Sequence, residues 1–109
     1  MNVIMISPGY PAEMALFARG LAASGASVIG VGDQPPGSVP AAARDALAHY
    51  VPVGSLADAD AVAITVREQA RQVRIDRVEC VWEPYMLLAA RLREELGPVS
   101  YTHLTLPTN

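Results

Sequence analysis

Short, continuous apolar runs along the chain alternate with longer segments in which apolar residues recur every three or four positions. The first run, Val3 to Ile6, is closed by Ser7-Pro8-Gly9. Such runs are typical of strands buried on both faces of a parallel sheet, and the proline and glycine that follow indicate a turn. Comparable runs predict further strands at residues 26–31, 50–53 and 78–82. Pro52 places the 50–53 strand at the sheet edge, because proline cannot donate to a strand ladder.

The segments between and after these strands predict four helices, at residues 11–24, 41–48, 58–73 and 85–96. Pro11 suits the first turn of the first helix, and Gly25 suits a stop after its end. The prolines within residues 34–40 indicate a loop. Ser55 is the expected N-cap of the third helix, with Asp58 as its capping-box partner.

Helical spacing predicts which side chains of the first and third helices are buried. The apolar stripe of the first helix is Met14, Leu16, Phe17 and Leu21. The apolar stripe of the third helix is Val62, Val66, Ala70 and Val73. The opposite stripe of the third helix, either a solvated face or a contact for a phosphate or a partner domain, is Arg67, Arg71 and Arg74.

Strand and helix therefore alternate along the whole chain. Alternation with short connections requires parallel strands joined by right-handed crossovers. The predicted fold class is α/β, a three-layer Rossmann-like half-domain with a four-stranded parallel sheet and helices on both faces. The chain of 109 residues is long enough for one small domain, which we expect at residues 1–97.

Composition narrows the chemistry that this domain can perform. The formal net charge is −3 and no basic run is present, so neither nucleic acid nor a membrane is an expected partner. All 8 cationic side chains are arginine, which excludes lysine-dependent chemistry. The lone cysteine, Cys80, lies in an apolar run and is expected to be buried rather than reactive. The N-terminal apolar run is too short for a signal peptide, so the expected compartment is the cytoplasm.

One place in the predicted sheet is suited to a ligand. Open α/β sheets bind ligands beyond the carboxyl ends of the strands, where the winding direction reverses. If the first strand is central and the fourth lies beside it, the loops at that point are residues 7–10 and 82–85. The candidate substrate-binding residues are Ser7, Gly9, Tyr10, Glu83 and Tyr85.

These candidate residues have two interpretations. Glu83 is suited to an ammonium group or a ribose hydroxyl, and Trp82 and Tyr85 are suited to flat apolar contacts. The same residues are also explained as a tight turn, a strand-end carboxylate and core or interface packing. No catalytic residue and no metal ligand is assigned.

A dinucleotide site is the competing interpretation. It would require G-x-G-x-x-G after the first strand, where this chain has Ser7-Pro8-Gly9-Tyr10-Pro11-Ala12. The two prolines remove amides that would bind a pyrophosphate. Asp33, at the end of the second strand, is nevertheless placed for a ribose hydroxyl. The two histidines, His49 and His103, form no ligand cluster with Cys80, and no G-x-S-x-G motif is present.

Three segments together resemble the N-terminal domain of ATP-grasp proteins: Met1 to Pro11, Val28 to Asp33 and Val78 to Tyr85. The resemblance covers residues 1–97, and its layout is similar to the pre-ATP-grasp domain of carbamoyl-phosphate-synthase-like and biotin-carboxylase-like ligases. It implies ATP-dependent ligation of a carboxylate to a nucleophile through an acyl-phosphate. It also implies that ATP and Mg²⁺ belong to the parent protein and are held mainly by two later domains.

The resemblance therefore describes an N-terminal fragment whose partners are those later domains and a small-molecule substrate. The fragment alone is expected to hold no cofactor and to be inactive. Two alternatives stay open: a Rossmann-like nucleotide-binding domain of an oxidoreductase or sugar-nucleotide enzyme, and a stand-alone interaction module.

The end of the chain is expected to be a non-native, disordered tail, residues 98–109. Residues 99–108 resemble the translated read-through of a transposon-based sequencing adapter. Composition changes at the same place, since alanine and arginine vanish and threonine becomes the commonest residue. This segment is therefore excluded from fold reasoning.

Overall fold

A computed structural model describes residues 1–9, 13–80 and 83–96 of the chain. The strands and helices in chain order are β1 (Asn2–Ile6), α1 (Glu13–Ala23), β2 (Ser27–Gly32), α2 (Ala41–Ala46), β3 (His49–Pro52), α3 (Ala59–Gln72), β4 (Arg77–Glu79) and α4 (Met86–Leu96). Two short 3-10 turns lie at Pro36–Ser38 and Glu83–Tyr85. The predicted tail, residues 98–109, lies outside the described residues, and so does Pro11.

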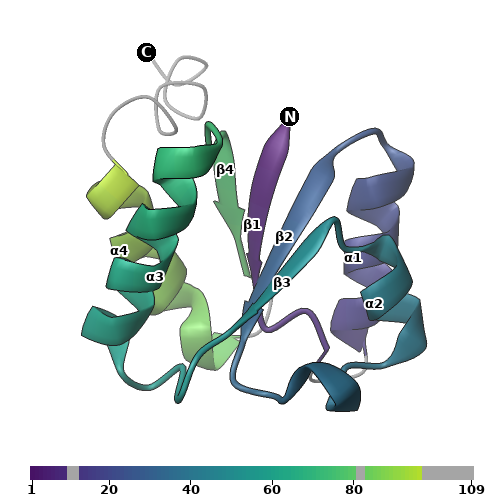
Figure 1. Ribbon diagram of the computed structural model, residues 1–109, viewed down its shortest axis with the longest axis horizontal. Coiled ribbons are helices and arrows are strands. Elements are labelled where there is room, and N and C mark those ends of the chain that lie inside the picture. The colour runs from purple at the N-terminus through teal and green to yellow at the C-terminus, as the bar shows by residue number, and fades with distance from the viewer. Residues whose placement is uncertain (10–12, 81–82, 97–109) are drawn as a thin grey trace.

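The four strands form one parallel sheet in the order β3-β2-β1-β4. Helices α1 and α2 cover one face of this sheet, and α3 and α4 cover the other (Figure 1). This arrangement confirms the predicted α/β fold class, with β1 in a central position and β3 at an edge. The helices between strands return the chain to the end of the sheet at which the next strand begins, as parallel pairing requires.

Side chains of the central strands alternate between two cores, as the pleat of a strand requires. Ile4 and Ile6 of β1 point into the larger core, which α3 and α4 complete with Val62, Val66, Leu88 and Leu92. Met5, between them in sequence, points to the opposite core with Met14 and Ala18 of α1. Residues 3–9 are all buried, so β1 is shielded on both faces.

Two predicted members of the helical stripes are exposed. Leu16 is 62% exposed, because it lies two positions from both Met14 and Ala18 and therefore points to the opposite side of α1. Val73 is 41% exposed, because α3 ends at Gln72 and Val73 already has an extended backbone. The prediction was wrong at both positions.

The predicted N-cap of α3 is also wrong. Asp58 is the N-cap, and its carboxylate accepts a hydrogen bond of 3.2 Å from the Ala61 amide. Ser55 instead accepts from the Ala57 amide at 3.1 Å, within the preceding turn. Gly25 has a φ of 99° after the end of α1, which confirms its role as a helix stop. Cys80 is buried, as predicted.

Within the described part of the chain, no helix has the length and apolar character that crossing a membrane would require.

Candidate functional site

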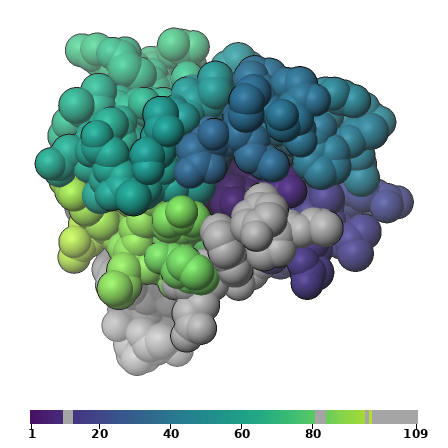
Figure 2. Space-filling model, turned by 90° about the horizontal axis from the view of Figure 1, so that it is seen from below, coloured from purple at the N-terminus to yellow at the C-terminus, as the bar shows by residue number. Residues whose placement is uncertain are grey.

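The carboxyl ends of β1 and β4 lie side by side in the sheet. β1 pairs with β2 on one side and with β4 on the other, and Met5 is in register with Glu79. The winding direction reverses between these two strands, which is where open α/β sheets place their ligands. Figure 2 looks onto this edge and shows atoms from the start of the chain recessed beneath the β2–α2 segment. The expected arrangement, with β1 central and β4 beside it, is therefore confirmed, and a substrate site at the ends of these strands stays a prediction.

Ser7 leaves β1 with a left-handed backbone. Its φ is 58°, a conformation that costs a residue with a side chain about 1–3 kcal/mol. The Ser7 amide donates a hydrogen bond of 2.8 Å to the Val31 carbonyl, and the residue is buried. The sheet thus holds Ser7 in an unusual conformation at the switch point, a placement often found at ligand sites.

Gly9 is in close contact with the loop that follows β2. A Cβ atom at this position would lie 2.5 Å from Gln34 Oε1 and 3.0 Å from Pro40 Cδ. Real Cβ atoms do not approach other atoms so closely, so only glycine fits here without a shift. Gly9 therefore has a packing role, and its role toward a substrate stays a prediction.

The second candidate loop, residues 82–85, is described only from Glu83 onward. Glu83 begins the short 3-10 turn before α4, and Tyr85 ends that turn. Tyr85 is partly buried and packs against the larger core, which agrees with its structural interpretation. Tyr10 and Trp82 lie outside the described residues. Substrate contacts by this loop stay a prediction.

Tyr50 of β3 is a residue near this edge that the sequence interpretation missed. Its hydroxyl donates a hydrogen bond of 2.7 Å to the Gln34 carbonyl. Its ring lies over β2, since a Cβ at Gly30 would meet the ring at 3.2 Å and one at Gly32 would meet the hydroxyl at 2.8 Å. The alternation of glycines in β2 beside an aromatic residue in β3 is the signal that could have predicted this contact.

The environment of Tyr50 favours its protonated form. Burial raises the pKa of the hydroxyl, the hydrogen bond to Gln34 lowers it, and the negative charge of Asp33 raises it. The net direction is upward, so Tyr50 acts as a neutral donor that fastens the loop after β2.

The residues that the structure describes near the switch point do not fit a nucleotide phosphate. Pro8 has no amide hydrogen and is fully buried, and Gly9 is covered by Gln34 and Pro40. Asp33, the candidate for a ribose hydroxyl, accepts a hydrogen bond of 3.3 Å from the Leu56 amide. Among the described residues, no group of three or more potential metal ligands comes together. The dinucleotide-binding alternative is therefore not favoured.

Comparisons with known proteins agree with this fold. The crystal structure of L-amino acid ligase from Bacillus licheniformis superposes with a TM-score of 0.64 at 23% sequence identity, over 87% of this chain. The match spans only 23% of the length of that ligase. A search of curated proteins gives no match.

The sequence itself matches the ATP-grasp N-terminal domain over residues 22–98. This match includes β2, β3 and β4 with the helices between them, so it covers most of the sheet described above. The parallel order β3-β2-β1-β4 and the likeness to a ligase structure are consistent with it. The chain belongs to the ATP-grasp N-terminal domain family.

Proposed function

We propose that this domain is the N-terminal part of an ATP-dependent ligase that joins a carboxylate to a nucleophile through an acyl-phosphate. The observation that carries the proposal is the family match over residues 22–98. The likeness to an L-amino acid ligase over 87% of this chain supports it. In this proposal the domain is a structural and substrate-side module.

The domain's part in the reaction is to position substrate. β1 and β4 pair side by side in the sheet. In the loops that follow them, the residues proposed to face the substrate are Ser7, Gly9, Tyr10, Glu83 and Tyr85. ATP and Mg²⁺ are assigned to the remaining domains, because Pro8 and the covered Gly9 do not fit a phosphate. There, ATP with Mg²⁺ would supply the phosphoryl group that activates the substrate carboxylate as an acyl-phosphate, with ADP as the leaving group.

Amino acids are the first substrates to test. The ligase with the similar fold is named for L-amino acids, and a carboxylate such as that of Glu83 is the type of group that binds an ammonium. The remaining domains of the longer protein are the proposed partners of this domain.

The test is an assay of the full-length protein encoded by the genomic reading frame. Release of inorganic phosphate from ATP should depend on Mg²⁺ and on an added amino acid, and mass spectrometry should detect a ligated product. Glu83→Gln should raise the KM for the amino acid more than the KM for ATP. Equal effects on both substrates would argue against a substrate-side role, and a full-length protein without ATP turnover would contradict the ligase proposal.

A further inference from the structure

The turn that follows β1, residues 7–9, is supported by β2 and by the loop after β2. Pro8 is fully buried, and a Cβ at Gly30 of β2 would lie 2.8 Å from its ring. Gly9 lies against Gln34 of the loop, since a Cβ at Gly9 would lie 2.5 Å from Gln34 Oε1. The conformation of this turn, called the β1 turn below, therefore depends on the placement of Gly30 and Gln34.

Tyr50 of β3 touches both of these supports. It is in register with Gly30, and a Cβ at Gly30 would lie 3.2 Å from its ring. The ring and Pro8 thus share the space that this glycine leaves open. The Tyr50 hydroxyl donates a hydrogen bond of 2.7 Å to the Gln34 carbonyl. One side chain from β3 therefore stands behind both contacts of the β1 turn.

The position of Tyr50 is itself fixed by packing. Its ring packs against a buried cluster made by Ala15 of α1, Ala43 of α2 and Val39 of the loop. Val39 also faces the β1 turn, since it would lie 3.5 Å from a Cβ at Gly9. A close-packed side chain with few alternative rotamers transmits its position to its neighbours. Tyr50 is therefore able to hold the loop in one place.

The β1 turn requires such support because Ser7 has an unusual backbone conformation. Its φ is 58°, in the left-handed region, and its amide donates a hydrogen bond of 2.8 Å to the Val31 carbonyl. A residue with a side chain persists in this region only when its surroundings determine the conformation. The contacts of Pro8 and Gly9 supply part of that constraint.

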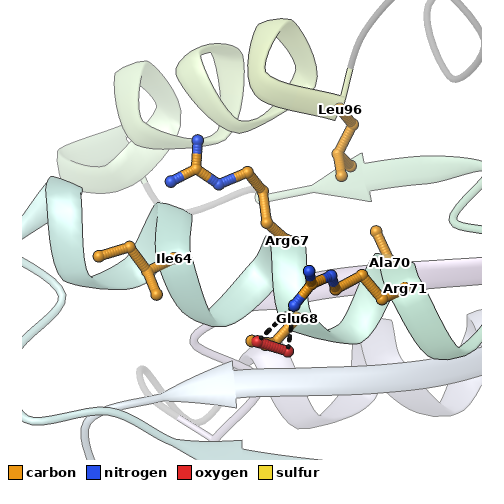
Figure 3. Close-up of a pocket in the computed structure, with 6 residues that line it drawn as sticks. All are labelled: Ile64, Arg67, Glu68, Ala70, Arg71 and Leu96. Atoms are coloured by element: carbon orange, nitrogen blue, oxygen red, sulfur yellow. Dashed lines mark hydrogen bonds and ion pairs between the residues drawn. The ribbon is translucent and has the colours of Figure 1, made fainter.

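The groove on the outside of α3 takes no part in this support. It has a volume of about 500 Å³ and is lined by Ile64, Arg67, Glu68, Ala70, Arg71 and Leu96. Figure 3 shows Arg71 paired with Glu68 there. Tyr50 packs with α1 and α2, whereas α3 covers the opposite face of the sheet (Figure 1). The groove is therefore a place where a substitution should not disturb the β1 turn.

We propose that Tyr50 is a positioning residue for the substrate, because it holds the β1 turn in place through Gly30 and Gln34. This inference rests on the proposed function, in which Ser7 and Gly9 face an amino acid. Tyr50 acts through the turn, since its hydroxyl is engaged by Gln34 and its ring by Gly30. ATP is assigned to other domains, so the effect of Tyr50 falls on the amino acid and not on ATP.

The first experiment measures steady-state kinetics of the full-length protein with Tyr50→Phe, which keeps the ring and removes the hydrogen bond to Gln34. The KM for the amino acid should rise about fivefold, the usual effect of one hydrogen bond, and the KM for ATP should not change. Gln34→Ala, which uncovers Gly9, should raise the same KM. The double variant should be no worse than the more affected single variant, because both changes act through one loop.

Two control variants separate positioning from a general loss of stability. Asn2→Ala also removes one hydrogen bond of 2.7 Å to a backbone carbonyl, that of Arg74, but at the beginning of β1. Arg71→Gln changes the groove outside α3. Neither variant should change the KM for either substrate. An amino acid KM that Tyr50→Phe leaves unchanged would overturn the proposal, and so would equal increases in Tyr50→Phe and in either control.

Hydrogen exchange in the purified chain tests the support of the β1 turn without any activity. The Ser7 amide should exchange about fivefold faster in Tyr50→Phe than in wild type, and Asn2→Ala should leave its rate unchanged. An unchanged Ser7 rate in Tyr50→Phe would overturn the proposal even in an active ligase. Faster exchange at Ser7, together with a full-length protein that does not turn over ATP, would contradict the proposed function while supporting the role of Tyr50 in holding the turn.

Discussion

At the residue scale, the packing between β2 and β3 depends on glycines, which have no side chain, as much as on larger residues. Gly30 leaves room for three neighbours at once: a Cβ there would lie 2.8 Å from Pro8, 2.9 Å from Leu47 and 3.2 Å from Tyr50. Pro8 follows the left-handed Ser7, so this contact also supports the turn at the candidate site. One small residue in β2 therefore helps to position the loop after β1.

Gly30→Ala should destabilise the domain by about 1–3 kcal/mol, because the added methyl group must displace well-packed neighbours. Gly20→Ala is the matched control, since Gly20 lies within α1 and a Cβ there meets nothing within 4 Å. That change should stabilise the domain by about 0.5–1 kcal/mol through the better helix propensity of alanine. Urea unfolding of both variants measures the difference, and equal effects would contradict the close packing at Gly30.

The raised pKa of Tyr50 predicts that the free energy of unfolding depends on pH in the alkaline range. Its pKa is raised in the folded state, mainly by burial, so the folded chain holds the proton more tightly than the unfolded chain. The resulting stability is fully present below the unfolded pKa, about 10, and is lost as the pH rises through the higher folded value. Tyr50→Phe should cost about 1 kcal/mol at neutral pH, because the hydrogen bond to Gln34 is lost.

Comparing wild type with Tyr50→Phe across alkaline pH distinguishes the effect of Tyr50 titration on stability from that of the other tyrosines. The wild-type free energy of unfolding should decrease more steeply than that of Tyr50→Phe as the pH rises above about 10. Parallel curves for the two proteins would show that Tyr50 is not protected from titration in the folded state.

At the element scale, the start of α3 shows how a helix boundary is decided by contact rather than by residue type. Ser55 and Asp58 are both good capping residues, and they are three positions apart. The chain turns at Ser55 and begins the helix after Asp58, where the carboxylate reaches the Ala61 amide. Leu56 between them is 2% exposed, so its burial in the larger core determines where the turn ends.

Asp58→Ala should destabilise the domain by about 1 kcal/mol, the usual cost of losing an N-cap. Ser55→Ala should cost roughly 0.5 kcal/mol or less, because its hydroxyl serves only an exposed turn. The urea midpoints of the two variants, at an unchanged slope, give the comparison. A larger loss of stability for Ser55→Ala than for Asp58→Ala would indicate that Ser55 is the N-cap.

At the scale of the whole molecule, we propose that the domain supplies one side of a site and that further domains supply the other. β1 and β4, which precede the two candidate loops, pair side by side in the sheet. The match to the L-amino acid ligase spans only 23% of that longer chain. Phosphoryl transfer needs cations and Mg²⁺ arranged around the phosphates. The residues described at this edge provide a buried proline and a covered glycine instead.

The purified chain by itself should therefore neither hydrolyse ATP nor bind NAD or NADP. A coupled assay for ADP and titration calorimetry with each nucleotide are the measurements, and the full-length protein is the positive control for ATP. A dissociation constant for NAD in the low micromolar range, near −8 kcal/mol, would revive the dinucleotide-binding alternative. ATP turnover that follows the folded chain through purification would contradict the assignment of catalysis to other domains.

The sequence by itself determined the elements and the fold class of this protein. The apolar run of β1, the proline in β3 and the stop at Gly25 were all predicted, because burial on both faces, a missing amide and a positive φ are local constraints that a sequence displays directly. The expected place of β4 beside a central β1 was also found, because alternation of strand and helix limits the possible sheet orders.

Only the tertiary structure decided which of these local preferences prevailed. It selected Asp58 over Ser55 as the N-cap, exposed Leu16, and placed the Tyr50 ring over two glycines of a neighbouring strand. It also placed α3 beside α4, so that Asp60 forms an ion pair with Arg91. These outcomes depend on contacts between residues far apart in the chain, and a pattern with a period of two or of three to four residues carries no information about such contacts.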